Sequence, residues 1–329
     1  MRRFTDFAFT GRCRNTLVYF AIFIGIFMLL MSLFSFIIAI AISLLSPSST
    51  PMNVDNVEQI AGTISRYAII ASIIAFIPSF LATWFILPRV HKRRFITFNT
   101  VRRNFSFKRY FTAIFVVALV YTASFCIEYF FTDHDYVFNF DPNSFYKALP
   151  IALLILPIQT YLEEFFFRAY LLQGVASGTK NVLASILVTS TIFALLHSVN
   201  PEVSKYGAIN VIGSIFIMGL GYTIITVLDG GVELSSGLHA FNNISACLFV
   251  GMETNVLGAK PLFTSNTISE SMMLPGAIIQ TCIIILILFL IFRWKNFSDL
   301  THKYSNEEIE SISSESEFID IAGNNKDFK

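Results

Sequence analysis

Long uninterrupted runs of apolar residues are the feature that most constrains this chain. Neither Leu17 to Leu45 nor Leu274 to Phe292 contains a charged residue. A helix needs about 20 mostly apolar residues to cross a hydrocarbon core of about 30 Å. Only 14% of the 329 residues are charged and 54% are apolar, whereas a soluble domain carries about 25% charged residues. The chain is therefore expected to be a membrane protein rather than a large soluble domain.

The apolar runs predict an all-α polytopic membrane protein with about eight transmembrane helices. The expected helices cover residues 17–45, 68–88, 110–131, 149–173, 182–203, 207–228, 234–252 and 274–293. The first run is longer than the core of a signal peptide, which has about 7–15 residues, so we expect it to remain as a helix. The four cysteines lie far apart without a CxxC pair, which predicts neither a disulfide nor a structural zinc.

Positive charge gives the expected orientation. Lysine and arginine are concentrated in the N-terminal arm and in residues 89–109, whereas residues 46–66 and 132–147 contain few. Because cytoplasmic loops carry the excess of basic residues, both termini are predicted to lie on the cytoplasmic side of the cell membrane. The basic segment 89–109 is expected to act as a topology signal and to meet anionic lipid headgroups. The net charge of +1 gives no indication of nucleic-acid binding.

The chain divides into three predicted regions. Residues 1–148 form an N-terminal membrane region of three helices that includes the basic segment. Residues 149–293 form a membrane core, and residues 294–329 are polar and acidic. A segment of that last composition cannot bury enough apolar surface to fold alone, so a disordered cytoplasmic tail is expected.

Several polar and ionisable residues lie inside the apolar runs of the membrane core. They are Glu163, Glu164 and Arg168 in the fourth expected helix, His197 in the fifth, and His239 and Asn243 in the seventh. Such groups are costly in a bilayer and usually mark function. Glu164 and Arg168 lie four residues apart on one helix face, so Arg168 is expected to neutralise Glu164 and leave Glu163 freer to act. Taken singly, each group also fits a structural ion pair, a packing histidine or an interhelical hydrogen bond.

The three groups fall near the midpoints of their expected helices and could therefore converge at one depth. The fourth, fifth and seventh helices would then enclose a polar cavity. Such a cavity would contain a base, a partner that holds water, and donors for an oxyanion, which are the parts of a hydrolase.

Three short motifs carry a family resemblance. Glu163-Glu164-x-x-x-Arg168, Phe193-x-x-x-His197 and His239-x-x-x-Asn243 stand in this order within residues 149–252. They resemble the motifs of the CAAX protease and bacteriocin-processing family, also called CPBP or Abi, which includes type II CAAX prenyl endopeptidases and bacteriocin-processing or immunity proteins. The resemblance implies that residues 149–293 are the core of an intramembrane endopeptidase.

The resemblance also implies a role for each residue. Glu163 would be the general base for a water held with His197. His239 and Asn243 would stabilise the oxyanion, and Glu164 and Arg168 would hold the geometry and charge of the site. The substrate would be a peptide or small membrane protein, with or without a lipid modification, reached from within the membrane lipid.

Whether a metal ion takes part in the reaction stays open at this point. Two histidines with a glutamate could bind a divalent metal such as zinc, and the family is often described as metalloproteases. The chain has no HExxH motif, and a metal-free, glutamate-dependent scheme is favoured.

Two other classes of function compete with an endopeptidase. One is a non-catalytic membrane scaffold or self-immunity protein, although this chain keeps every motif residue. The other is a proton-coupled transporter, in which intramembrane glutamate, histidine and arginine would form a relay. Transporters often contain inverted repeats, and this sequence shows no repeat.

Overall fold

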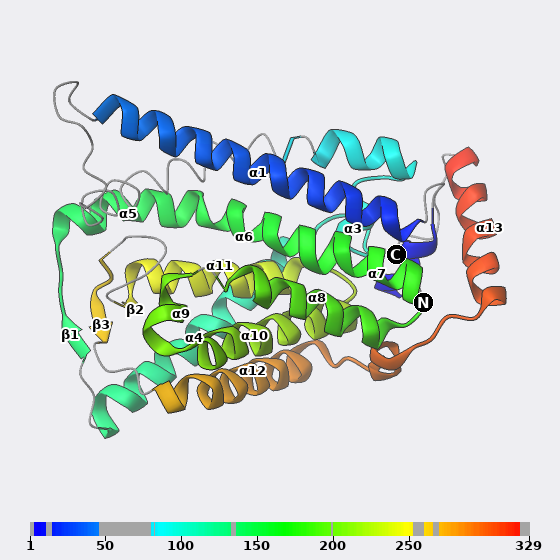
Figure 1. The fold of residues 1–329 in the computed structure, drawn as a ribbon. Coiled ribbons are helices and arrows are strands. Elements are labelled where there is room, and N and C mark those ends of the chain that lie inside the picture. Colours follow the sequence, from blue (N-terminus) through cyan, green and yellow to red (C-terminus); the bar gives the residue numbers. More distant parts are fainter. Residues whose placement is uncertain are drawn as a thin grey trace.

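The computed structural model describes residues 3–10, 15–45, 80–81, 83–132, 136–198, 200–252, 260–265 and 270–322. These residues form a bundle of helices whose long axes run in roughly one direction (Figure 1). A small sheet lies at one end, which we call the sheet end. Helices α3 (Ile96–Asn99) and α13 (Asn306–Ala322) lie at the other, which we call the termini end. The expected all-α membrane class is confirmed apart from this sheet.

The remaining elements follow in chain order. The first part contains η1 (Phe4–Phe9), α1 (Thr16–Leu45), α4 (Phe107–Phe131), β1 (Tyr136–Phe138) and α5 (Pro142–Leu154). The second part contains α6 (Leu156–Glu164), the π-helical segment η2 (Phe165–Leu171), α7 (Leu172–Thr179), α8 (Val182–Leu196), α9 (Pro201–Tyr206), α10 (Ala208–Asp229), α11 (Glu233–Leu248), β2 (Val250–Met252), β3 (Phe263–Ser265), α12 (Glu270–Phe292) and η3 (Phe297–Thr301). Strand β3 lies between β1, to which it is antiparallel, and β2, to which it is parallel.

Within the described residues, four helical segments are long and apolar enough to cross a membrane. They are Phe107–Phe131, Pro142–Thr179, Ala208–Asp229 and Met272–Phe292, and they correspond to four of the expected helices. The expected helix at 68–88 lies largely outside the described residues. Helices α8 and α11 have 15 and 16 residues, which is shorter than the usual span of about 20.

Helix α8 ends earlier than expected, and this changes the setting of His197. The prediction extended the helix to residue 203, but α8 ends at Leu196 and His197 is its C-cap. Pro201 begins α9, and the preceding Asn200 is extended with a ψ of 141°. A proline disfavours helical backbone in the residue before it, so one continuous helix cannot run through Asn200 to residue 203. The expectation that His197 lies within a helix is therefore wrong.

Helix α11 is central to the bundle and packs against α4, α5, α6 and α10. It lies very close to α4 at Gly237, where an added Cβ would lie 2.2 Å from the carbonyl oxygen of Tyr110. A side chain of any kind would push the two helices apart there. Because His239 follows two residues later, this contact fixes the depth at which α11 presents its polar residues.

The acidic tail differs from the disordered segment that was expected. Its described part forms η3 and α13, and α13 packs against η1. The hydroxyl of Tyr304 donates to Asp6 at 2.8 Å, and Arg3 donates to Glu308 at 2.7 Å. The tail therefore gains its partners from the N-terminal arm, a tertiary contact that tail composition does not encode.

Part of the basic segment 89–109 also faces protein rather than lipid headgroups. Arg93 is buried and donates to the carbonyl of Phe7 and to the side chain of Gln173. Arg102 and Arg109 form ion pairs with acidic residues at the termini end of α10 and α11. These three arginines anchor the segment to the bundle.

Candidate active site

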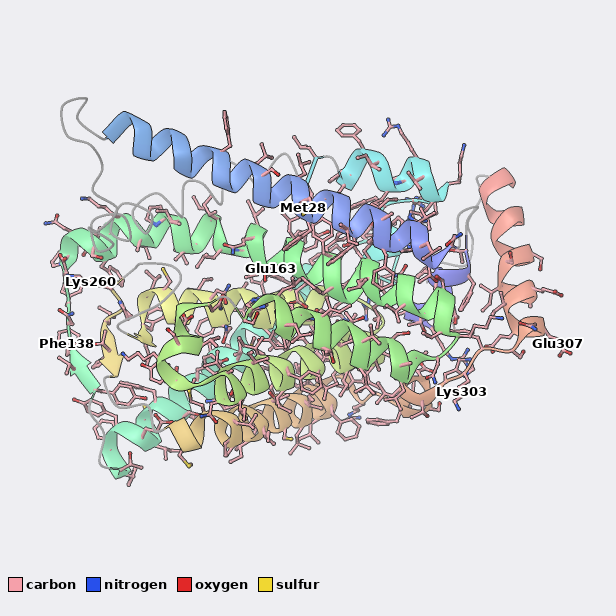
Figure 2. All side chains as sticks on the ribbon, in the orientation of Figure 1. Met28, Phe138, Glu163, Lys260, Lys303 and Glu307 are labelled. Carbon is pink, nitrogen blue, oxygen red and sulfur yellow. The ribbon has the colours of Figure 1, made fainter. Side chains whose placement is uncertain are left out.

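The two adjacent glutamates lie where the helical pitch changes. Glu164 is the last residue of α6, and the π-helical segment η2 follows it at once. Such π-helical turns are rare and often occur at functional sites. Glu164 is fully buried, whereas the side chain of Glu163 is 21% exposed. Figure 2 shows Glu163 about midway between Phe138 at the sheet end and Lys303 at the termini end.

Glu164 is held by two partners through the same oxygen. Arg168 Nη1 donates to Glu164 Oε1 at 2.9 Å, and His239 Nδ1 lies 2.8 Å from that oxygen. The pairing of Glu164 with Arg168 agrees with their spacing along the helix. All three side chains are buried, so the charge on Glu164 is compensated without help from solvent.

Glu163 is much less constrained. Its Oε1 accepts a long hydrogen bond of 3.4 Å from Gln159, one turn earlier in α6. Its Oε2 lies 3.9 Å from His239 Nε2. The imidazole of His239 therefore stands between the two carboxylates, close to Glu164 and at a longer distance from Glu163. This gap leaves one carboxylate able to hydrogen-bond a further molecule.

Two aromatic rings enclose the polar group. The guanidinium of Arg168 lies 3.9 Å from the ring centre of Phe193, and the rings of Phe193 and Tyr222 lie 6.1 and 5.9 Å from that of His239. Gly219 leaves room for this stack, since an added Cβ would lie 3.1 Å from both Arg168 and Phe193. Phe193 opens one of the three motifs. No sequence signal selects Tyr222, because it is a single tyrosine in an apolar helix.

His197 reaches the group through Phe193. Its Nδ1 lies 2.8 Å from the carbonyl oxygen of Phe193, and the two rings are 4.5 Å apart. The structure thus brings His197 to the edge of the site, beyond the ring that covers Arg168.

Asn243 lies one turn after His239 on α11. Its Oδ1 accepts a hydrogen bond of 3.0 Å from the side chain of Asn242, whose own Oδ1 accepts one of 2.8 Å from Tyr121 on α4. The amide nitrogen of Asn243 is then available as a donor. Five of the six expected residues therefore lie along the Glu164–His239 contact and the facing turn of α11.

The donor set does not fit a divalent metal. Within the described parts of the chain, no three histidine, cysteine, aspartate or glutamate side chains are grouped closely enough to hold one. The reason is visible in the contacts, because His239 Nδ1 and Glu164 are engaged with each other and with the cation of Arg168.

These features define a helical membrane protein with a buried carboxylate, histidine and arginine site. Residues 145–245 match the family model described as "Type II CAAX prenyl endopeptidase Rce1-like". This region, which contains all six motif residues, is therefore similar to the Rce1-like family. The resemblance that the motifs indicated is thereby confirmed over residues 145–245.

A relative from Bacillus subtilis (strain 168) is similar over part of its length. It is named "Uncharacterized protein YyaK", and it is 36% identical over 189 residues. The match covers 56% of this chain and 60% of that protein. The chain thus spans less than two thirds of the relative, whose name states no activity.

Proposed function

We propose that this protein is an intramembrane endopeptidase that hydrolyses a peptide bond with water activated by Glu163. The observation that carries the proposal is the unequal pairing of the two glutamates. Glu164 is compensated by Arg168 and His239, whereas Glu163 keeps a partly exposed carboxylate beside the same imidazole. A general base needs this freedom to reach the proton that it removes.

Charge balance supports an imidazolium at His239. The two glutamates bring two negative charges and Arg168 brings one positive charge. A protonated His239 makes the buried group neutral, and burial favours neutral groups because unpaired charge is costly there. Only the imidazolium carries protons on both nitrogens. It can then donate from Nδ1 to Glu164 and from Nε2 toward an oxyanion.

The reaction follows from this arrangement. Glu163 takes a proton from water as the water oxygen bonds to the carbonyl carbon of the substrate. The negative charge passes to the carbonyl oxygen, which accepts hydrogen bonds from His239 Nε2 and Asn243 Nδ2. Glu163 then returns the proton to the amide nitrogen, and the carbon–nitrogen bond breaks. The net charge of the buried group and the substrate stays at zero in the intermediate, because Glu163 is protonated while the oxyanion forms. The hydrogen-bond donors of His239 and Asn243 are already in place and stabilise the oxyanion.

Arg168 and His197 act indirectly in this scheme. Arg168 holds Glu164 and is a positioning residue. His197 orients the ring of Phe193, and with it the wall beside the water. The substrate is a peptide or small membrane protein that enters from the lipid, since a site midway along the bundle is more readily reached from within the membrane.

We also propose that the termini end faces the cytoplasm of the cell membrane. The basic segment, η1 and α13 gather at this end, opposite the small sheet (Figure 1). Positive loops favour the cytoplasmic side.

The test compares cells that express the wild type or Glu163→Gln at equal levels in the membrane. New protein N-termini are profiled by mass spectrometry. Cleavage products present with the wild type and absent with the variant support the proposal and identify substrates. Identical profiles would contradict it, since the amide that replaces the Glu163 carboxylate cannot act as the base.

A further inference from the structure

A cavity lies beside the candidate active site, and none of the proposed catalytic residues lines it. It has a volume of about 520 Å³ and lies toward the sheet end, between α4, α11 and α12. Most of its wall is aromatic or apolar, with polar side chains at a few points. Its aromatic wall residues are Tyr121, Phe125, Tyr136, Phe241, Phe249 and Phe263.

A chain of hydrogen bonds joins this cavity to the proposed oxyanion donor. Tyr121 and Asn242 both line the cavity. Tyr121 donates to Asn242 at 2.8 Å, and Asn242 donates to Asn243 at 3.0 Å. Because the oxygen of Asn243 is occupied in this way, its amide nitrogen is the end left to face a substrate. Whatever fills the cavity therefore sits one residue from the group that would hold the oxyanion.

The size and lining of the cavity indicate its occupant. Pockets of about 300–1,000 Å³ commonly hold small ligands, so this one can accept bulky apolar side chains. Aromatic walls provide large apolar contact area. Glu128 also lines the cavity and accepts a hydrogen bond from Tyr136, and a carboxylate at this point would repel an acidic side chain.

We infer that this cavity is the specificity pocket for large apolar side chains of the peptide substrate beside the scissile bond. Asn242 is the positioning residue that couples the pocket to Asn243. The inference rests on the proposed endopeptidase function and adds the substrate class to it, a peptide with bulky apolar and non-acidic residues at the cut.

The first test changes the volume of the pocket. Ala246→Trp fills it, whereas Phe249→Ala enlarges it at a residue that is 42% exposed. Ala123→Trp is the matched control, because Ala123 is an exposed residue of α4 that is not among the lining residues. The probes are internally quenched peptides that carry glycine, alanine, leucine, phenylalanine or glutamate beside the cut, with wild-type protein in liposomes.

The expected result is a change in preference. Ala246→Trp should lower cleavage of the leucine and phenylalanine peptides at least tenfold relative to the alanine peptide, since even one methylene more or less in an apolar pocket changes discrimination by about 10–200-fold. Phe249→Ala should weaken the preference for phenylalanine. The control should match the wild type. An equal loss on all peptides, or the same loss with Ala123→Trp, would overturn the pocket assignment.

The coupling is tested separately with Tyr121→Phe and Asn242→Ala. Loss of the hydrogen-bond chain should lower kcat three- to tenfold with both variants. Tyr121→Phe keeps the ring that lines the pocket, so it should leave KM and the side-chain preference unchanged. A change in KM alone would contradict the positioning role.

A binding measurement separates this inference from the proposed function. A phenylalanine peptide with a photoreactive ring is irradiated with Glu163→Gln, which should bind without cutting, and labelled residues are mapped. Labelling of the pocket wall that disappears with Ala246→Trp supports the pocket even if no peptide is cleaved. Labelling by a photoreactive lipid with no labelling by the peptide would assign the cavity to lipid and overturn the inference.

Discussion

Two pairs of acidic residues in this protein have different surroundings. At the termini end, Asp229 accepts hydrogen bonds from Arg102, Arg109 and Trp294 at 2.8 to 3.2 Å. Glu233 accepts from Arg102 at 3.3 Å and from a backbone N–H at 3.2 Å. Midway along the bundle, Glu164 has two close partners, Arg168 and His239, which both contact its Oε1. Glu163 has one hydrogen bond of 3.4 Å and a histidine at 3.9 Å.

The difference distinguishes a structural acid pair from a reactive one. Two arginines balance Asp229 and Glu233, so those carboxylates have little reason to exchange protons. One arginine and one histidine balance Glu163 and Glu164, and a histidine can gain or lose a proton at a ring nitrogen whereas an arginine stays protonated. Under the proposed mechanism, proton transfer is therefore confined to the central pair.

The substitution with the largest expected effect removes the carboxylate of Glu163, the less constrained member of the central pair. Glu163→Gln should lower peptide cleavage by about 10²–10⁴-fold, the usual contribution of a general base. Its thermal midpoint in detergent should stay within the error of the wild type, because Glu163 has few partners to lose. A large fall in that midpoint would show that Glu163 is structural.

The substitution with the next largest effect removes Arg168, the cation that pairs with Glu164. Arg168→Ala should lower the free energy of unfolding by about 3–5 kcal/mol, because it leaves Glu164 buried without its arginine. Arg168→Lys is the matched control and should lose less. Thermal and denaturant unfolding in detergent measure both variants, and an unaffected Arg168→Ala would remove the positioning role assigned to Arg168.

The third effect tests the histidine that completes the charge balance. His239→Gln should lower kcat by about 10²–10³-fold, as expected for loss of an oxyanion donor. Glutamine keeps a donor but not the positive charge. Single-turnover cleavage measures the loss, and full activity would show that the imidazolium is not needed.

The substitution with the smallest expected effect changes the structural pair of Asp229 and Glu233, as a comparison with the central pair. Asp229→Asn should cost about 1–3 kcal/mol of unfolding free energy, since it weakens charged hydrogen bonds without emptying the site. Cleavage by the folded fraction should stay within about twofold of the wild type. A fall as large as that of Glu163→Gln would erase the distinction between the two pairs.

The sequence predicted the elements that depend on local pattern. The expected ends of α4, α10 and α12 agree with the structure to within a few residues, because long apolar runs mark a membrane helix directly. The pairing of Glu164 with Arg168 was predictable for the same reason, since residues four apart share a helix face.

Features that depend on tertiary contact were not predictable. The three strands have three residues each, too short to show an alternating pattern. The contact of His239 with Glu164 joins residues that are 75 positions apart, and the aromatic cover by Tyr222 comes from a third helix. Helix α13 of the tail packs against η1, at the opposite end of the sequence.

The most direct test of the central claim is peptide hydrolysis in ¹⁸O-labelled water. A substrate found by N-terminal profiling is incubated in liposomes with wild type, Glu163→Gln or Asp229→Asn, and the new C-terminus is weighed by mass spectrometry. The account predicts one ¹⁸O in the new carboxylate with the wild type and with Asp229→Asn, and no product with Glu163→Gln. Labelled product formed by Glu163→Gln at the wild-type rate would contradict it.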